Sequence, residues 1–356
     1  MRIVVNNIAA SSGGALSILK SFYNYLKNNE AQKENEWVFL LSDNYIEETD
    51  NIKVIVLKDV KKSWINRLKF DLYSGKNIIS ELKPDVVFSL QNTITFGINC
   101  CPQVLYMHQS IPFQKDVKFS FLKSEERILA VYQYIIGNLI KKSIKKSDKT
   151  IVQTNWIRDA VIKETKISPN KIISILPPVE NMTAYKKQNC LKKNNFFYPA
   201  AKNIYKNHKC IYEASELLNK KGVTDFNISL TINSNKSRDN FIYLGIIPFE
   251  SVMEQYNLST LIFPSYIETV GLPLIEASQM ETIILVADCA YSREVLKNYE
   301  NAYFFDPFNP EELAILMQKV MTSQIRKLPL NKIVDDSLDG WLAVIEIIEG
   351  ISGEEK

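Results

Sequence analysis

The chain has 356 residues, which corresponds to about two domains of roughly 150 residues each. With 46% hydrophobic and 23% charged residues it has the composition of a folded globular protein, and no apolar run reaches the roughly 18 to 20 residues of a membrane-spanning helix. The net charge of +3 is unevenly spread, because residues 1–175 hold 25 Lys and Arg against 17 Asp and Glu, whereas the rest holds 18 against 23. The basic half favours an anionic partner, such as lipid headgroups, a polyanionic substrate or nucleic acid, although a solvated basic face explains the excess equally well.

Cysteine and histidine usage argues against a disulfide framework and a soft-ligand metal site. The chain has five cysteines, an odd number, and only two histidines. No C-x-x-C pair occurs, and Cys100 and Cys101 are adjacent. The first apolar run, Arg2–Val5, is too short for a signal peptide. We therefore expect a cytoplasmic protein.

Short β-branched runs alternate with helix-length amphipathic segments, which predicts a parallel sheet with helices on both faces. In the first half the expected strands are Arg2–Val5, Trp37–Leu41, Lys53–Leu57, Val86–Leu90, Val104–Met107, Thr150–Val152 and Ile172–Leu176. Pro177 and Pro178 then break the regular structure, and a polar stretch follows. We predict a first domain over 1–176 and a linker over 177–194.

A second α/β series follows over 195–330. Its expected strands are Phe196–Tyr198, Asn227–Thr231, Tyr243–Gly245, Leu261–Phe263 and Ile283–Val286, and its expected helices are His208–Leu218, one from Gly271, and Pro310–Met321. The last amphipathic pattern, in 331–356, either completes this domain or crosses back to the first. The predicted fold class is α/β, with two Rossmann-like, doubly wound parallel-sheet domains facing each other across a cleft.

The segment from Phe263 to Ala277 carries the clearest chemistry. An apolar strand leads into a short loop, and a helix begins near Gly271, so the backbone N–H groups of Thr269, Val270 and Gly271 are expected at a helix N-terminus. The carboxyl end of a parallel strand is where open α/β sheets bind ligands, and exposed N–H donors there favour phosphate. Glu268 precedes this helix and Glu276 lies inside it, so both can border one site.

This segment closely resembles the E-x7-E motif of retaining, nucleotide-sugar-dependent glycosyltransferases with the GT-B fold, specifically family GT4. The resemblance extends over most of the chain. It implies that Glu276 binds the ribose hydroxyls of the donor and that Glu268 contacts the donor sugar or stabilises positive charge near its anomeric carbon. At Val270 the chain departs from the family, in which an aromatic residue is common.

Three further blocks carry the resemblance. Gly13 and Gly14, in the NNIAASSGG loop, are implied to face the donor phosphates and the acceptor. His108, in VLYMHQ, is implied to reach toward the transferred sugar. Lys206, in YKNH, is implied to contact the donor diphosphate. Many members carry an arginine five positions before this lysine; here Ala201 stands there, and Lys202 is the candidate for the second cation.

The resemblance implies an enzyme that transfers a hexose or N-acetylhexosamine, with retention, from a nucleotide-diphosphate sugar to a glycan acceptor. UDP is favoured over GDP as the nucleotide, and the expected acceptor is linked to a polyprenyl diphosphate in cell-surface polysaccharide synthesis (O-antigen or capsule). The sequence contains no D-x-D motif, so we expect no metal requirement and no cofactor beyond the donor co-substrate.

Two basic segments suggest that the enzyme binds its acceptor at a membrane surface. Lys58–Arg67 interleaves cations with Trp64 and Ile65, and the last six residues of Ile136–Lys146 include four lysines. Such segments can lie on an anionic membrane, which would place the enzyme peripherally on its inner face. The alternative is that both are solvated helix faces.

Other functions remain open. A nucleotide-sugar 2-epimerase shares the architecture, but the combined motifs favour transfer. Phosphorylases of this fold have a much longer chain and a cofactor lysine. A non-catalytic carbohydrate-binding or membrane-surface protein would not need both glutamates and Lys206. Nucleic-acid binding would explain the basic half but none of these motifs, and no nucleic-acid partner is expected.

Overall fold

The computed structural model describes residues 1–11, 13–187, 191–235, 237–329 and 340–353, and it divides into two compact units. The first unit comprises Met1–Pro178 together with the last helix, α13 (Gly340–Gly353), and the second comprises the described part of Val179–Asp336. Part of the predicted linker, 188–190, and the start of the predicted C-terminal segment, up to 339, lie outside the described residues.

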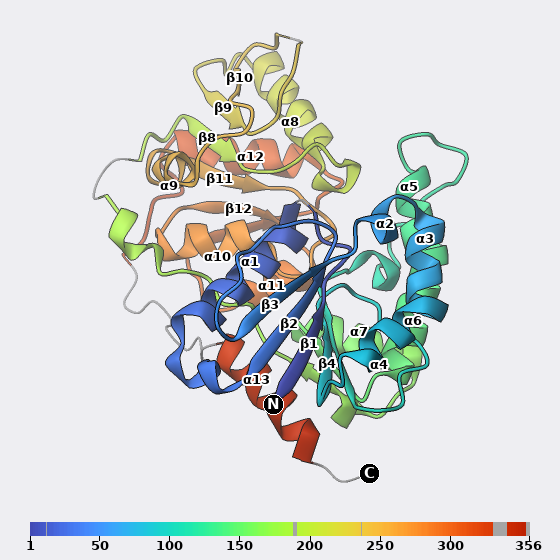
Figure 1. The fold of residues 1–356 in the computed structure, drawn as a ribbon. Helices are drawn as coiled ribbons and strands as arrows, with labels where there is room; N and C mark the ends of the chain where they lie inside the picture. The colour runs from blue at the N-terminus through green and yellow to red at the C-terminus, as the bar shows by residue number, and fades with distance from the viewer. Residues whose placement is uncertain (12, 188–190, 236, 330–339, 354–356) are drawn as a thin grey trace. The chain divides into compact units, whose positions relative to one another are not determined.

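The first unit is built on a seven-stranded parallel sheet in the order β3-β2-β1-β4-β5-β6-β7 (Figure 1). Its strands are β1 (Arg2–Asn6), β2 (Glu36–Leu41), β3 (Ile52–Val56), β4 (Val86–Ser89), β5 (Gln103–Met107), β6 (Lys149–Val152) and β7 (Ile172–Ser174). Central strands of such a sheet are covered on both faces, which is why β1, β4 and β5 are continuous apolar runs rather than alternating ones.

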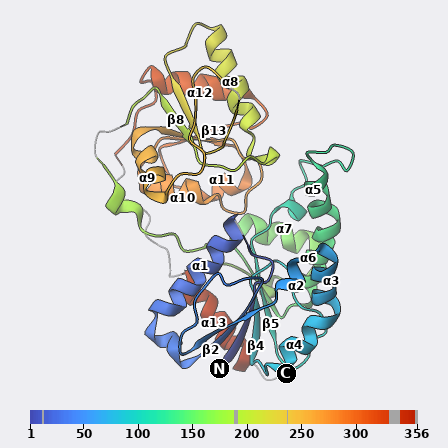
Figure 2. The ribbon, with the colours of Figure 1, turned by 45° about the horizontal axis from the view of Figure 1, so that its top comes forward.

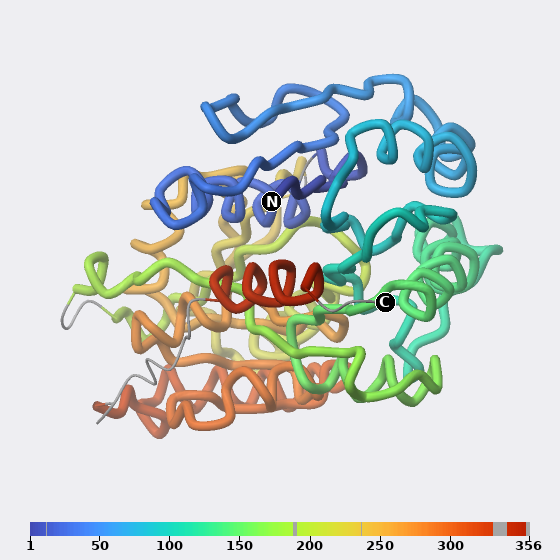
Figure 3. Tube along the Cα trace, turned by 60° about the horizontal axis from the view of Figure 1, so that its bottom comes forward, coloured from blue at the N-terminus to red at the C-terminus, as the bar shows by residue number. Residues whose placement is uncertain are grey.

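Helices α1 (Gly13–Asn28) and α13 cover one face of this sheet. Trp341 of α13 packs against Phe22 of α1, with ring centroids 4.8 Å apart and the ring planes tilted by 53°, and its indole N–H donates to Ser21 Oγ at 2.9 Å. The same ring lies 5.6 Å from Tyr106 of β5. The amphipathic pattern at the end of the chain therefore completes the core of the first unit, and Figure 3 shows α13 in red across this face.

The opposite face is covered by helices from the middle of the chain. They are α2 (Lys58–Lys61), α3 (Trp64–Lys69), α4 (Gly75–Glu81), α5 (Arg127–Ala130), α6 (Gly137–Lys146) and α7 (Asn155–Thr165). π-helical turns at Phe70–Ser74 and Val131–Ile136 join α3 to α4 and α5 to α6. Ile79 of α4, Ile144 of α6 and Val161 of α7 are fully buried in this layer.

The second unit has a six-stranded parallel sheet in the order β10-β9-β8-β11-β12-β13. Its strands are β8 (Asn195–Tyr198), β9 (Asn227–Leu230), β10 (Phe241–Tyr243), β11 (Thr260–Phe263), β12 (Ile284–Ala287) and β13 (Ala302–Phe305). Helices α8 (His208–Lys220) and α12 (Pro310–Met321) cover one face (Figure 2). Helices α9 (Phe249–Leu258), α10 (Leu272–Gln279) and α11 (Ala290–Val295) cover the other.

The prediction of two doubly wound parallel-sheet domains is confirmed, with differences at individual elements. The strand expected at Tyr243–Gly245 is instead Phe241–Tyr243, because Gly245 has φ +66° and leaves the extended conformation. The edge strand β13 and the short helices α9 and α11 were not predicted.

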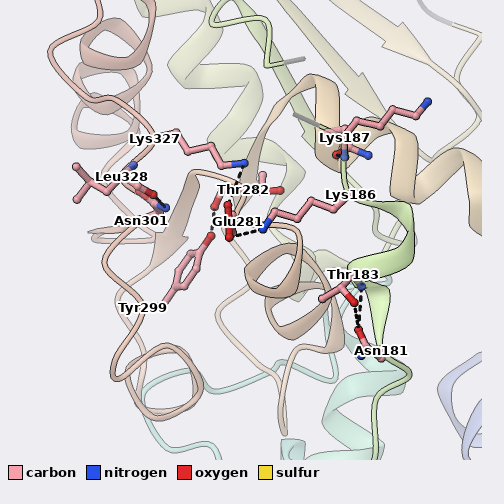
Figure 4. A network of polar contacts seen from close by, with 11 residues as sticks. Asn181, Thr183, Lys186, Lys187, Glu281, Thr282, Tyr299, Asn301, Lys327 and Leu328 are labelled. Carbon is pink, nitrogen blue, oxygen red and sulfur yellow. Dashed lines mark hydrogen bonds and ion pairs between the residues drawn. The ribbon is translucent and has the colours of Figure 1, made fainter. Parts of the chain in front are cut away.

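Part of the predicted linker is bound to the second unit by a hydrogen bond and an ion pair. Met182 opens a 3₁₀ turn and is buried, and its N–H donates to Gln279 Oε1 at 2.8 Å. Lys186 and Lys327 both pair with Glu281 in the turn after α10, Lys327 at 3.7 Å (Figure 4). Segments before β8 and after α12 thus meet on one carboxylate.

Candidate active site

The carboxyl ends of β8 and β11 mark the ligand edge of the second unit. These strands are neighbours at the centre of the sheet, and the strand order runs outward in opposite directions from them. In open α/β sheets, ligands bind at the carboxyl ends of the strands where the strand order reverses in this way. In this chain the loops that follow the two strands are 199–207 and 264–271.

Backbone and side-chain hydrogen bonds join these two loops. The N–H of Tyr266 donates to the carbonyl oxygen of Tyr205 at 3.1 Å. The amide of Asn207, a residue with φ +58°, donates to the carbonyl oxygen of Pro264 at 3.3 Å. The hydroxyl of Tyr198 donates to the carbonyl oxygen of Lys206 at 2.8 Å. The backbone around Lys206 is thus held from both strands.

Lys206 and Glu268 are brought together by this arrangement. Lys206 Nζ lies 2.5 Å from Glu268 Oε1, and the side chains are 19% and 14% exposed. The lysine therefore comes from the loop after β8 and the first glutamate of the motif from the loop after β11. Because both side chains are partly shielded from water, the attraction between the cation and the carboxylate is stronger than it would be in bulk water.

Glu276 lies one turn inside α10 and is bound by a residue that sequence reasoning left unassigned. The hydroxyl of Tyr256, in α9, donates to Glu276 Oε2 at 2.9 Å. Burial raises the pKa of Glu276, and the Tyr256 hydrogen bond acts in the opposite direction. Tyr256 is buried, and a buried tyrosine hydroxyl requires a partner, but its sequence position does not indicate which one.

Gly271 is the N-cap of α10 with φ +77°, and Pro273 stands in the first turn, as the sequence indicated. A Cβ at Gly271 would lie 3.3 Å from ring atoms of both Phe263 and Tyr291, so only glycine fits without displacement. Thr269 and Val270 precede the helix, and Val270 is buried.

Lys202 stands apart from this group. It is exposed, and in the described part of the chain it makes no hydrogen bond or ion pair. Ala201, where many members of the resembling family carry an arginine, is exposed as well. Among the described residues, no group of three His, Cys, Asp or Glu side chains could hold a metal ion.

The ligand edge of the first unit lies at β1 and β4, where its strand order also runs outward in both directions. Gly13 begins α1 after the loop that follows β1, with φ +60°, and a Cβ at Gly13 or Gly14 would meet no atom within 4 Å. The start of α1 therefore has open space around it.

His108 lies directly after β5 at the same edge. Asn92, in the loop after β4, contacts it twice. The His108 backbone N–H donates to Asn92 Oδ1 at 2.7 Å, and Asn92 Nδ2 lies 2.9 Å from His108 Nε2. Burial lowers the pKa of His108 to about 4, so the imidazole is neutral at neutral pH.

Comparison with known proteins finds relatives of this chain. Residues 183–333 match the family model of glycosyl transferases group 1. The O-antigen chain mannosyltransferase RfbU of Salmonella typhimurium is 24% identical over 282 residues, covering 71% of this chain and 78% of that protein. Residues 183–333 are thus similar to the group 1 glycosyl transferases. The matched region contains Lys206, Glu268 and Glu276.

Solved structures share the fold of this chain. The lipopolysaccharide-biosynthesis glycosyltransferase WaaG superposes with a TM-score of 0.69 at 14% identity, covering 98% of this chain and 100% of that one. Anabaena HepE, solved in complex with UDP-glucose, superposes with a TM-score of 0.62 at 12% identity, covering 98% and 95%. The predicted GT-B fold is thereby confirmed.

None of the helices in the described ranges combines the length and the apolar character required to cross a membrane.

Proposed function

We propose that this glycosyltransferase moves a hexose or N-acetylhexosamine, with retention, from a nucleotide-diphosphate sugar to a glycan acceptor. The observation that carries the proposal is the Lys206–Glu268 pair at the carboxyl ends of β8 and β11, inside the region that matches the family model. A lysine there can bind a diphosphate, and a carboxylate beside it can face the sugar. Both groups stand where sheets of this topology bind nucleotides.

In the proposed reaction the bond between the anomeric carbon and the diphosphate oxygen breaks as the acceptor oxygen bonds to the same face of that carbon. The acceptor hydroxyl gives its proton to the departing phosphate oxygen. Lys206 stabilises the negative charge on the leaving diphosphate, together with N–H groups at the start of α10. Glu268 stabilises positive charge at the anomeric carbon, and Glu276 accepts from the ribose hydroxyls.

The chemistry assigned to Lys206 makes a metal ion unnecessary in this proposal, since a fixed cation stabilises the leaving group. A transfer assay in the presence of EDTA tests it. Turnover that persists in EDTA supports the proposal, and a reversible loss of turnover contradicts it. Analysis of the product's anomeric configuration tests retention, and release of a 2-epimerised sugar without any acceptor product would point to an epimerase instead.

UDP is the proposed nucleotide, and the HepE complex with UDP-glucose supports it for a protein of this fold. The names of RfbU and WaaG, an O-antigen mannosyltransferase and a lipopolysaccharide-biosynthesis glycosyltransferase, support a role in lipopolysaccharide or O-antigen assembly. We therefore propose a glycan acceptor carried on a polyprenyl diphosphate.

A lipid-linked acceptor would require the enzyme to meet a membrane surface, and the first unit exposes apolar side chains suited to this. In α3, Trp64 is 60% and Ile65 66% exposed. Trp64 also contacts Tyr132, in the π-helical turn after α5, with ring centroids 5.8 Å apart. Ile128, in α5, and Ile135, in the π-helical turn, are exposed as well. We call these exposed residues of two helical segments, which are joined by the Trp64–Tyr132 contact, the apolar patch.

The cations of Lys58–Arg67 contribute less than their number suggests. Arg67 pairs with buried Asp71 at 3.1 Å, and Lys62 pairs with Asp59 at 2.5 Å. Lys61 donates to the carbonyl oxygen of Ala9 at 3.0 Å. In α6, by contrast, Lys142, Lys145 and Lys146 are exposed and form no ion pair with any described residue. We therefore expect α3 to contribute mainly apolar side chains to the proposed membrane contact and α6 to contribute its unpaired lysines.

Flotation with anionic vesicles tests this contact. We expect the protein to float with the vesicles and the double variant Trp64→Ser/Ile65→Ser to remain in solution. Ile246→Ser is the matched control, because Ile246 is 97% exposed but belongs to the second unit. Equal flotation of all three proteins, or flotation of none, would contradict a membrane role for the patch.

A further inference from the structure

The two hydrogen bonds between Asn92 and His108 determine which imidazole nitrogen carries the proton. A backbone N–H can only donate, so the atom of the Asn92 amide that lies 2.7 Å from the His108 nitrogen must be its oxygen. The other amide atom is then the NH₂ group, which can only donate. It lies 2.9 Å from His108 Nε2, so Nε2 must accept.

We propose that Asn92 is a positioning residue that holds His108 as the neutral Nδ1–H tautomer, so that the imidazole offers the transferred sugar a hydrogen-bond donor and not a proton-transfer group. The assignment of the sugar as the partner rests on the proposed function. The tautomer follows from the geometry of Asn92 and His108 alone.

Protonation of His108 is opposed by the same contact. A proton on Nε2 would put two donors, the imidazole N–H and the amide N–H, face to face at 2.9 Å. Burial of the ring acts in the same direction, since it disfavours the charged imidazolium. A neutral His108 can still donate through Nδ1. It has no proton to give from Nε2, where the amide of Asn92 occupies the lone pair.

The backbone at Asn92 fits this role. Asn92 has φ +69°, in the left-handed region that Asn and Asp adopt more readily than other non-glycine residues. The loop after β4 thereby turns the Asn92 side chain toward the end of β5, where His108 begins the next loop. Replacement by Asp keeps the shape and the backbone preference but removes the NH₂ donor.

Imidazole ¹⁵N NMR measures the tautomer directly, and the chain has only two histidines to resolve. The variant His208→Asn removes the second signal, because His208 lies in α8 outside the proposed chemistry. At neutral pH we expect a protonated Nδ1 and an unprotonated Nε2 in His108. In Asn92→Asp the carboxylate can only accept, so we expect Nε2 to become protonated.

Transfer activity gives the second readout. Asn92→Asp should lower kcat/KM by roughly tenfold, corresponding to one mispaired hydrogen bond. Asn92→Ala, which removes both contacts, should give mixed tautomers. A protonated Nε2 in the unaltered protein, or the same tautomer in Asn92→Asp, would overturn the inference. Absence of any sugar transfer would overturn the proposed function instead, and the NMR result would still test the tautomer.

Discussion

Lys206 Nζ and Glu268 Oε1 lie 2.5 Å apart and join the loops that follow the two central strands of the second unit. The pair is independent of the backbone hydrogen bonds between these loops, such as that from Tyr266 N–H to the Tyr205 carbonyl oxygen. The loop geometry should therefore survive loss of the lysine. This separation makes a functional test of the charge possible.

Lys206→Gln is expected to retain the fold and to lose transfer activity by about 10²- to 10³-fold, the usual effect of removing one preorganised stabilising group. Steady-state kinetics measures the loss, and circular dichroism checks the fold. Lys209→Gln is the matched control, since Lys209 makes only an exposed pair with Glu213 at 3.5 Å. Activity of Lys206→Gln equal to that of Lys209→Gln would exclude Lys206 from leaving-group stabilisation.

Tyr256→Phe removes the hydroxyl that donates to Glu276 and leaves a partly buried carboxyl oxygen without this donor. We expect the free energy of unfolding to fall by about 1–3 kcal/mol and nucleotide affinity to weaken, because the carboxyl group is no longer oriented. Urea denaturation and calorimetric titration measure the two effects. Tyr303→Phe in β13 serves as the control, as Tyr303 forms no hydrogen bond with any described residue. Unchanged nucleotide affinity in Tyr256→Phe would show that Tyr256 does not orient Glu276.

The raised pKa of Glu276 has a defined consequence for stability. Below its ordinary pKa of 4.5 this group is neutral in both the folded and the unfolded state. Above 4.5 the folded state retains the proton that the unfolded state has lost, so the group's contribution to stability falls as pH rises toward the folded-state pKa.

Unfolding free energies measured from pH 4 upward, for the unaltered protein and for Glu276→Gln, should therefore differ in slope. The unaltered protein should lose stability relative to the variant as pH rises above 4.5, and the difference should become constant at higher pH. Nucleotide affinity should rise over the same window, because the ionised carboxylate is the better acceptor for ribose hydroxyls. Parallel stability curves would contradict a raised pKa.

Glu281 is expected to act locally. It receives Lys186 and Lys327 from two segments, so Glu281→Gln should increase amide hydrogen exchange in 181–187 and 325–328 and leave exchange in the sheet unchanged. The control is Glu213→Gln, which affects one exposed pair. Increased exchange throughout the second unit would show that Glu281 supports the whole unit and not these two segments.

Sequence patterns indicated most of the fold because buried parallel strands are apolar runs with β-branched residues, as in β1, β5 and β11. The edge strands were harder to predict. Most residues of β10 and β13 are half-buried. The end of β10 also depends on the backbone at Gly245, which has a positive φ. The amphipathic pattern of the last helix did not indicate which unit it packs on, because this depends on the tertiary contacts of Trp341.

The candidate site shows the same division. Strand-end positions and family motifs indicated Lys206, Glu268 and Glu276, because those signals lie in contiguous sequence. Tyr256 and Asn92 act through contacts with residues 20 and 16 positions away on other elements. These contacts depend on the tertiary structure, so the sequence alone did not indicate them. Lys202, a neighbour of Lys206 in sequence, is not brought to Glu268.

The central claim is that the second unit binds the nucleotide of a donor sugar through Glu276. Thermal stability measured with UDP, GDP, ADP, dTDP and CMP, each without added metal, tests it most directly. A nucleotide at 100 times its dissociation constant should stabilise the fold by about 2.7 kcal/mol. We expect this shift with UDP and its loss in Glu276→Ala. No shift with any nucleotide, or a shift that persists in Glu276→Ala, would contradict the account.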